Sequence, residues 1–286
     1  MFKKKIPSMN LILISTLSMG GLAAAFALFL SIAHRKLKVE EDPRVERILE
    51  ILPGANCGAC GYASCHALAE EMVKGNSSVN SCIAGGNNTS QKIAGILGVE
   101  SEVTQSKIAF LRCGASQSER KKKAEYEGIK SCQAADMIAG GELACAYGCL
   151  GYGDCQTACP FDAISMRDGL PQIELARCTG CGNCVKACPR NLISLEVLNE
   201  ESHYRVVCSS LDKGKKARTA CERACIACGI CVKVCPFDAC QIVDNLAVID
   251  QRNCQGCGIC AERCPTGAIH LVSRESYLVS SIAYCV

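Results

Sequence analysis

Cysteine is the residue type that determines the chemistry open to this chain. The 286-residue sequence contains 26 cysteines, and most of them stand in C-x-x-C runs that end in C-P. Thiolates at this spacing are typical ligands of iron–sulfur clusters, whereas a disulfide scaffold is usually a short secreted chain. We therefore expect these cysteines to bind [4Fe-4S] clusters.

The C-terminal part contains the regular form of a two-cluster motif. Two runs of the form C-x2-C-x2-C-x3-C-P begin at Cys225 and at Cys254. In such a motif the fourth cysteine of each run binds the cluster of the other run. The spacing therefore predicts two crossed ligand sets. These are Cys225, Cys228, Cys231 and Cys264 for one cluster, and Cys254, Cys257, Cys260 and Cys235 for the other.

The part of the chain that precedes this motif is a second copy of it. A shift of 76 residues brings nine pairs of cysteines into register, among them Cys132 with Cys208 and Cys145 with Cys221. So many coincidences at one offset indicate an internal duplication. The regular ligand set predicted for the first copy is Cys178, Cys181, Cys184 and Cys159.

The other run of the first copy departs from the motif. Tyr152 stands where the second copy has Cys228, so one ligand is missing. Cys145 is the nearest replacement in the sequence. The predicted set is then Cys145, Cys149, Cys155 and Cys188. The alternative is a site with three cysteines, holding a [3Fe-4S] cluster or one with a solvent ligand.

A different cysteine motif precedes both copies. The stretch C-G-A-C-G-Y-A-S-C is followed by a distant fourth cysteine, and the predicted ligands are Cys57, Cys60, Cys65 and Cys82. A helix expected over residues 62–74 places Cys65 in its first turn, where the helix dipole favours a thiolate. A structural zinc site is the alternative, but the neighbouring ferredoxin-type runs favour one more [4Fe-4S] cluster.

Six cysteines stand outside these motifs. Four of them flank the first copy and either bind a sixth cluster together or are buried free thiols; they are Cys113, Cys132, Cys208 and Cys221. Cys240 and Cys285 are expected to be unliganded, and Cys240 has the place that Ile164 has in the first copy. The sequence thus predicts five [4Fe-4S] clusters, or six if these four thiols form a site.

The N-terminal segment is long and apolar enough to cross a membrane. No charged residue occurs from Ile6 to Ala33, a stretch longer than the ~20 residues that a bilayer requires. A cleaved signal peptide is the alternative. Basic residues flank both ends, so charge does not fix the topology. Because cluster ligands must stay reduced thiols, we expect a single-pass protein of the cytoplasmic (inner) membrane with residues 39–286 on the cytoplasmic side.

The motifs divide the chain into four expected domains with an α+β fold. They are a membrane anchor (1–38), a small helical single-[4Fe-4S] domain (39–98), a first ferredoxin-like unit with flanking cysteines (99–210) and a second ferredoxin-like unit (211–286). A β-hairpin is expected between the two runs of each unit, with its turn at Asp168-Gly169 in the first and at Asp244-Asn245 in the second.

Other functional classes find no support in the sequence. The net charge of +3 does not favour a nucleic-acid partner. No G-x-G-x-x-G or G-x-x-x-x-G-K-[ST] motif is present, so we expect single-electron transfer and no complete active site on this chain. Two basic runs, Arg120–Lys123 and Lys213–Arg218, are expected to be solvated, or else to dock an acidic protein.

The order of these motifs resembles a known family. A membrane helix, then C-G-A-C-G-Y-A-S-C with Cys82, then two ferredoxin-like units is similar over essentially the whole chain to the B subunits of Rnf (Rsx) complexes. These complexes are ion-translocating ferredoxin:NAD oxidoreductases. The stretch from Cys145 to Cys155 looks like the longer form of that subunit, which has two ferredoxin units.

This resemblance implies a function as a subunit of an enzyme. Electrons from reduced soluble ferredoxin would enter this chain, pass to the membrane and flavin-carrying subunits, and finally reach NAD while Na⁺ or H⁺ is driven outward. The alternative is a membrane-tethered polyferredoxin that serves another redox enzyme, such as a hydrogenase.

Overall fold

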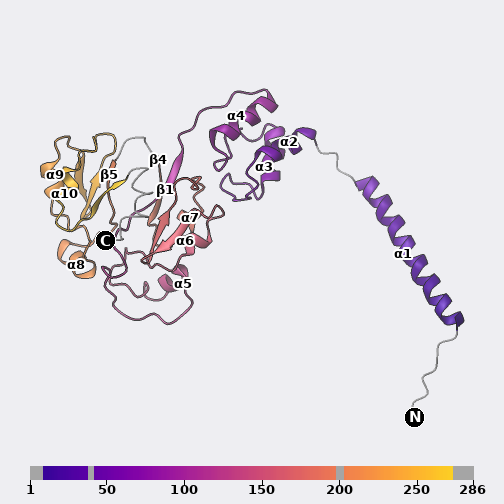
Figure 1. Cartoon of the computed structure of the whole chain (residues 1–286), viewed down its shortest axis with the longest axis horizontal. Helices are drawn as coiled ribbons and strands as arrows, with labels where there is room; N and C mark the ends of the chain where they lie inside the picture. Colours follow the sequence, from indigo (N-terminus) through magenta and orange to yellow (C-terminus); the bar gives the residue numbers. More distant parts are fainter. Residues whose placement is uncertain (1–8, 38–41, 198–202, 273–286) are drawn as a thin grey trace, which may run out of the picture. The chain divides into compact units, whose positions relative to one another are not determined.

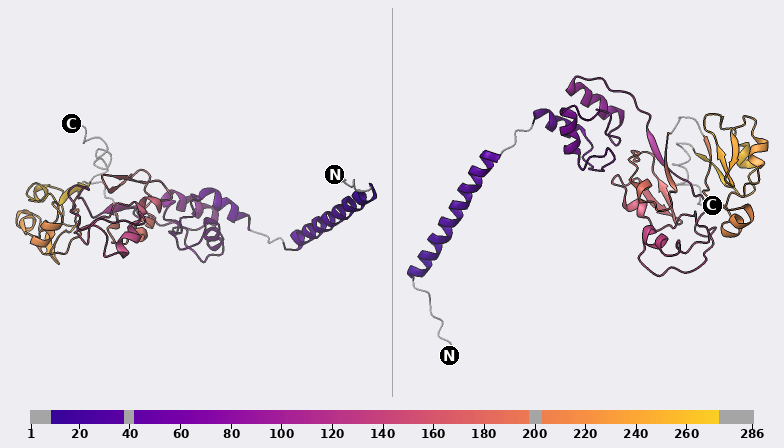
Figure 2. Two further views of the ribbon diagram at one scale, coloured as in Figure 1. Left: turned by 90° about the horizontal axis from the view of Figure 1, so that it is seen from below. Right: turned by 180° about the vertical axis from the view of Figure 1, so that it is seen from behind.

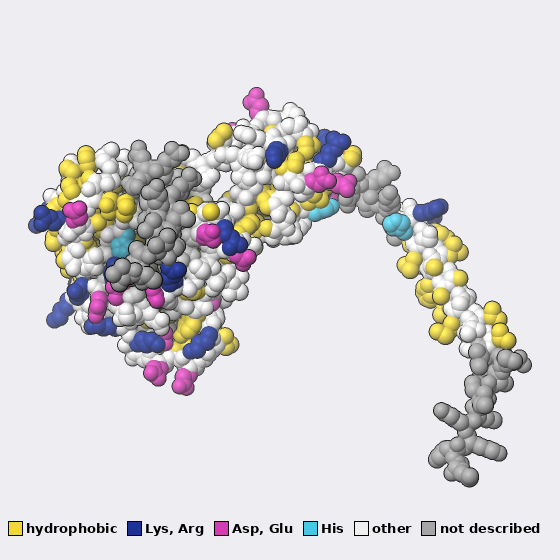
Figure 3. All heavy atoms as spheres, in the orientation of Figure 1, with side chains coloured by type: hydrophobic (Ala, Val, Ile, Leu, Met, Phe, Trp, Pro, Cys, Tyr) yellow, Lys and Arg dark blue, Asp and Glu magenta, His cyan; other side chains and the backbone are white. Residues whose placement is uncertain are grey.

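The computed structural model describes residues 9–37, 42–197 and 203–272, and the chain divides into two compact units, Met1–Pro43 and Arg44–Val286 (Figure 1). Cys285 lies outside the described residues. The described part of the first unit is one long helix, α1 (Met9–Leu37). Its segment Leu13–Lys36 has the length and apolar composition of a membrane span. Figure 3 shows apolar side chains along α1, and the basic residues His34, Arg35 and Lys36 occupy its last turn.

Three helices form the small N-terminal domain of the second unit, and Figure 2 shows them grouped in the purple part of the chain. They are α2 (Pro43–Ile51), α3 (Cys65–Val73) and α4 (Gly86–Leu97). Their apolar faces meet in a core that includes Ile48, Leu68 and Ile93. The helix expected over residues 62–74 begins at Cys65, because the Ser64 hydroxyl caps it by accepting a hydrogen bond from the Ala67 amide.

Each ferredoxin-like unit contains two antiparallel strand pairs. In the first, β1 (Lys107–Leu111) pairs with β4 (Ile193–Val197) and β2 (Ile164–Arg167) pairs with β3 (Leu170–Ile173). In the second, β5 (His203–Val206) pairs with β8 (Ile269–Val272) and β6 (Cys240–Val243) pairs with β7 (Leu246–Ile249). The two expected hairpins are present, and Asp244 and Asn245 both adopt the positive φ that a tight two-residue turn requires. The predicted α+β fold is confirmed.

Short helices carry the cysteine runs of both units. The runs that end in C-P lie on α6 (Asp154–Thr157), α7 (Asn183–Ala187), α9 (Ile230–Val234) and α10 (Ile259–Glu262). Two further helices lie outside these runs, α5 (Cys132–Met137) in the first unit and α8 (Gly214–Ala220) in the second. Each run therefore places its cysteines on a tight loop that leads into one helical turn.

The strand register shows that the two copies are not related by one offset throughout. Leu111 of β1 pairs with Ile193, and Val206 of β5 pairs with Ile269. The partners Ile193 and Ile269 are 76 residues apart, but Leu111 and Val206 are 95 apart. The first copy therefore has about 19 additional residues after β1.

This insertion changes which cysteines are equivalent. Cys113 and Cys208 each follow their strand by two residues, so they occupy the same place in the two copies. Cys132 lies in the inserted segment and has no counterpart. The match of Cys132 with Cys208 at an offset of 76 is therefore not a structural equivalence, and that expectation was wrong.

Candidate iron–sulfur sites

In the described part of the chain, several cavities are each lined by four cysteines. Two of the groups line one cavity each with the members that the spacing predicts: Cys57, Cys60, Cys65 and Cys82, and Cys225, Cys228, Cys231 and Cys264. Among the described residues no three His, Cys, Asp or Glu side chains converge closely enough to hold a single metal ion. Thiols that surround a cavity instead fit an inorganic core with several irons, so the donor set suits [4Fe-4S] clusters.

The N-terminal group is positioned by loop geometry and by α3. Gly58 and Gly61 adopt positive φ values of 67° and 88°, which lets the backbone turn around the cavity. The Cys65 amide donates a hydrogen bond to Asn56 Oδ1 at 2.8 Å. Burial and the nearby thiols of Cys65 and other members of the group raise the pKa of Cys82. A thiol in this position needs a metal or another cation to become a thiolate at neutral pH.

A regular group of the second ferredoxin-like unit receives hydrogen bonds from backbone amides, and burial acts on the thiols of the other regular groups. The Ala247 amide donates to Cys225 Sγ at 3.4 Å, and the Ala268 amide donates to Cys264 Sγ at 3.3 Å. In the first unit, burial and the neighbouring thiols of Cys178, Cys181 and Cys159, among others, raise the pKa of Cys184 to about 12. Burial and the Cys254 and Cys257 thiols likewise raise the pKa of Cys260.

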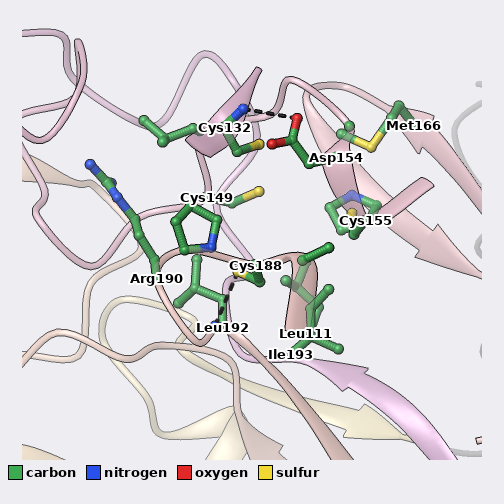
Figure 4. Close-up of a pocket in the computed structure, with 15 residues that line it drawn as sticks. Leu111, Cys132, Cys149, Asp154, Cys155, Met166, Cys188, Arg190, Leu192 and Ile193 are labelled. Atoms are coloured by element: carbon green, nitrogen blue, oxygen red, sulfur yellow. Dashed lines mark hydrogen bonds between the residues drawn. The ribbon is translucent and has the colours of Figure 1, made fainter. Parts of the chain in front are cut away.

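The irregular run of the first unit is completed by a residue other than the expected one. The cavity in Figure 4 is lined by four cysteines that come from separate segments: Cys132, Cys149, Cys155 and Cys188. Cys145 does not line this cavity. Burial, followed by the Cys132 and Cys188 thiols, raises the pKa of Cys155 to about 11. Cys132 therefore stands where Cys145 was expected.

Asp154 explains how Cys132 reaches this position. Its carboxylate accepts a hydrogen bond from the Cys132 amide at 2.9 Å, which Figure 4 shows as a dashed line. It also accepts hydrogen bonds from the Gln133 amide at 3.0 Å and the Ser131 hydroxyl at 2.9 Å. Burial alone would raise the pKa of Asp154, but these hydrogen bonds hold it below its ordinary value. Since Asp154 directly precedes Cys155, it fixes the start of α5 beside the Cys155 run.

Tyr152 stands at the sequence position of the missing ligand and packs against the same apolar cluster as Cys132. Its ring lies 5.9 Å from the Tyr126 ring, measured between centroids. Both rings belong to an apolar cluster that Cys132 also packs against. The second unit has Cys228 at the position of Tyr152 and Ile230 at the position of Asp154. The loss of one ligand and the gain of its substitute thus occur together in the first unit.

Cys145 belongs to a group that joins the two ferredoxin-like units. Burial, followed by the thiols of Cys113, Cys208 and Cys221, raises the pKa of Cys145 to about 11. Three of the four are buried, and Cys208 is partly buried. Each copy contributes equivalent members, because Cys113 matches Cys208 and Cys145 matches Cys221. The group is therefore pseudo-symmetric, which four thiols buried by chance would not be.

Hydrogen bonds connect this shared group to a cysteine group on either side. The Cys149 amide donates to Cys113 Sγ at 3.5 Å, and the Cys225 amide donates to Cys208 Sγ at 3.4 Å. These are equivalent bonds in the two copies. The shared group thus lies directly between a group of the first unit and a group of the second.

Further contacts continue the series toward the N-terminal domain. In the first unit the Cys155 thiol is close enough to Cys184 to act on its pKa. The Cys57 thiol acts in the same way on the pKa of Cys181. Asn183 Nδ2 donates a hydrogen bond to the Cys57 carbonyl oxygen at 3.1 Å. The N-terminal group therefore adjoins the group of Cys178, Cys181, Cys184 and Cys159.

Two buried arginines hold the loops around the irregular sites. Arg190 forms an ion pair with Asp136 at 2.8 Å and donates hydrogen bonds to the carbonyl oxygens of Cys145, at 3.1 Å, and Gly148, at 2.6 Å. Arg120 donates to the carbonyl oxygens of Cys149 and Gly169. Arg120 was expected to be solvated as part of a basic run. It is instead buried, with its guanidinium paired with backbone carbonyls, so that expectation was wrong.

The fold and the cysteine groups define a ferredoxin-type electron carrier with several [4Fe-4S] sites. Comparison with protein families agrees with this class. A model described as "Putative Fe-S cluster" matches residues 52–84, and two models described as "4Fe-4S dicluster domain" match residues 142–189, 177–239 and 224–268.

Curated relatives identify the family more closely. The B subunit of the Na(+)-translocating ferredoxin:NAD(+) oxidoreductase complex of Acetobacterium woodii is 42% identical over 85% of this chain and 72% of that protein. The B subunit of the ion-translocating oxidoreductase complex of Methanosarcina acetivorans is 39% identical over 85% of this chain and 92% of that protein. The B subunit of the proton-translocating ferredoxin:NAD(+) oxidoreductase complex of Clostridium ljungdahlii is 41% identical over 85% of this chain and 86% of that protein.

The chain belongs to the family of B subunits of ion-translocating oxidoreductase complexes, as its motifs predicted. It is therefore an iron–sulfur electron-transfer subunit of an oxidoreductase complex. With the apolar helix α1, this membership also makes it a membrane protein. The predicted family and the predicted [4Fe-4S] cofactors are confirmed.

Proposed function

We propose that this chain accepts electrons from reduced ferredoxin and relays them to the membrane and flavin-carrying subunits of an ion-translocating ferredoxin:NAD oxidoreductase. The names of two relatives describe their complexes as ferredoxin:NAD(+) oxidoreductases. The observation that supports a relay is the unbroken series of adjoining cysteine groups from Cys57 to Cys264. When bound in these groups, [4Fe-4S] clusters supply one-electron transfer.

The residues of this chain would hold six clusters in the following sets. Four sets are those that the regular spacing predicts, around Cys57, Cys184, Cys225 and Cys260. Two sets differ from the prediction, because Cys132 and Cys145 exchange places. They are Cys132, Cys149, Cys155 and Cys188, and the shared set Cys113, Cys145, Cys208 and Cys221. The shared set is the link without which the two ferredoxin-like units would have no adjoining groups.

The two ends of this series of cysteine groups would contact different partners. Among the described cysteines only Cys228 and Cys257, both in the second unit, are exposed. A site with an exposed ligand brings its electron nearer to an external partner, so the second unit is the end that would receive ferredoxin. The N-terminal domain directly follows the membrane anchor in the chain. It is therefore the end that would meet the membrane subunits.

Membrane vesicles that contain the whole complex test this function. The bulk of the chain is proposed to face the cytoplasm, where its thiols stay reduced. Inside-out vesicles given reduced ferredoxin and NAD are expected to form NADH and to accumulate Na⁺ or H⁺ in their lumen. Reduction of the clusters without NADH formation would instead favour a tethered polyferredoxin that serves a different enzyme. Activity confined to right-side-out vesicles would contradict the proposed side.

Asn183 is expected to keep the N-terminal group docked on the first ferredoxin-like unit. Its side-chain hydrogen bond to the Cys57 carbonyl joins these two domains beside a ligand of each site. Asn183→Ile, which copies Ile259 of the second unit, removes that donor. Loss of about 1 kcal/mol of docking energy lowers the equilibrium constant for docking about fivefold. We expect slower reoxidation of the ferredoxin-like clusters in stopped-flow experiments, with the iron content unchanged.

The matched control for Asn183 is Asn245. Its side chain also donates to a backbone carbonyl, that of Leu211 at 3.2 Å, but far from the N-terminal group in the sequence. Asn245→Gly preserves the positive φ of the turn. Equal rates for Asn183→Ile, Asn245→Gly and the unaltered chain would show that the Asn183 contact does not guide electron transfer.

A further inference from the structure

Cys240 is a buried thiol outside every proposed ligand set. It begins β6, where it pairs with Ile249 of β7, and it is 5% exposed. The equivalent residue of the first unit is Ile164, which pairs with Ile173 in the same register. The two units therefore differ at this position by a thiol in place of an apolar side chain.

The Cys240 thiol contacts two members of the adjoining ligand set. Cys240 and Cys260 belong to one buried cluster, and Cys235 packs against it. The Cys240 thiol lies close enough to both sulfurs to lower their pKa values as a hydrogen-bonding group. Burial alone would raise the pKa of Cys235, but the amides of Phe237, Ala239 and Cys240 and the Cys240 thiol hold it below its ordinary value. The Cys235 sulfur thus has hydrogen-bond donors around it, one of which is a side chain that its counterpart in the first unit lacks.

Cys240 is placed to donate a proton rather than to bind iron. Cys235, Cys254, Cys257 and Cys260 already supply the four thiolates that a [4Fe-4S] cluster takes. A fifth thiolate among them would be an unpaired charge in the apolar core that Cys240 shares with Ala239 and Ala247. Burying such a charge has a high cost in free energy. The protonated thiol, by contrast, carries no charge and can donate a hydrogen bond to a ligand sulfur.

We propose that the Cys240 thiol donates a hydrogen bond to the Cys235 sulfur and thereby raises the reduction potential of the cluster site formed by Cys235, Cys254, Cys257 and Cys260. Hydrogen bonds to ligand sulfurs are one of the factors that set such potentials, because they stabilise the more negative reduced state. Ile164 has no proton to donate. The inference rests on the ligand sets of the proposed function, and it assigns to one residue a difference in potential between the two units.

Redox titration of the full chain, followed by EPR, tests this assignment. Cys240→Ile copies the first unit, and Cys240→Ala removes the donor without adding volume. Both variants are expected to keep all their iron and to shift one titrating component to lower potential. Cys240→Ser keeps an O–H donor at the same place and is expected to shift that component less than either of the other two variants.

Two results would overturn the proposal, and they are distinguishable. Unchanged potentials in Cys240→Ala, with full iron content, would show that the Cys240 hydrogen bond does not act on the site. Loss of about four iron atoms in Cys240→Ala and Cys240→Ser alike would show that Cys240 is itself a ligand, which would also change the proposed ligand sets. If Cys240→Ile fails to fold, Cys240→Ala decides.

Discussion

Replacement of Cys208 by serine is expected to remove about four iron atoms per chain and to stop electron transfer between the two ferredoxin-like units. Cys208 belongs to the shared group with Cys113, Cys145 and Cys221, which adjoins a cysteine group on either side through equivalent amide-to-sulfur hydrogen bonds. The measurement is iron and sulfide per chain, together with NADH formation by the complex. Cys240→Ser is the control for iron content, since it changes a buried cysteine that is not proposed as a ligand.

Double variants decide which cysteines share a cluster. If Cys132 and Cys155 bind the same cluster, Cys132→Ser with Cys155→Ser removes about four iron atoms, as either single change does. If Cys132 and Cys208 bind different clusters, their double variant removes about eight. If the Cys132/Cys155 double variant instead removed about eight iron atoms and the Cys132/Cys208 double variant about four, the ligand sets predicted from spacing alone would be correct. That pattern would contradict the exchange of Cys132 and Cys145.

Replacement of Arg190 by methionine is expected to destabilise the first ferredoxin-like unit by about 3 kcal/mol. The Arg190 side chain is 5% exposed, and its removal leaves the Asp136 carboxylate and several backbone carbonyls without their donor. The expected loss of stability is at the low end for a buried ion pair because the Asp136 side chain is 31% exposed. One of these carbonyls belongs to Cys145, so the shared group is expected to lose its cluster first.

The loss of visible iron–sulfur absorbance in increasing denaturant measures this effect. The midpoint is expected to fall clearly for Arg190→Met. The matched control is Arg252→Met, because Arg252 also pairs with an aspartate, Asp250 at 3.0 Å, but is 90% exposed. Surface pairs contribute little to stability, so the control should keep the midpoint of the unaltered chain. A similar midpoint for both variants would show that Arg190 does not hold the site.

The sequence predicts the regular groups because their spacing is local. In a C-x2-C-x2-C-x3-C-P run, one loop and one helical turn place three thiols around a cavity, and no distant residue changes that geometry. Cys225, Cys228 and Cys231 line one cavity for this reason, with Cys264 crossing from the other run. The hairpin turns are local in the same sense, since Asp244 and Asn245 need only a positive φ.

The irregular groups could not be assigned from spacing, because tertiary contacts decide them. Cys145 is nearer in sequence to the incomplete run than Cys132 is. Cys132 nevertheless lines the cavity, because the Asp154 carboxylate fixes the start of its helix there. The insertion after β1 also made Cys132 coincide with Cys208 by chance. Ser131 as a helix cap and Asp154 beside Cys155 were the available signals, and neither is specific on its own.

The most direct test of the six-site series is the content of iron and acid-labile sulfide in the anaerobically purified full-length chain. We predict about 24 iron and about 24 sulfide per chain, since six groups of four cysteines each bind one [4Fe-4S] cluster. About 20 of each would mean that Cys113, Cys145, Cys208 and Cys221 bind no cluster, and the series between the two units would be interrupted. Zinc in place of iron would contradict electron transfer by this chain altogether.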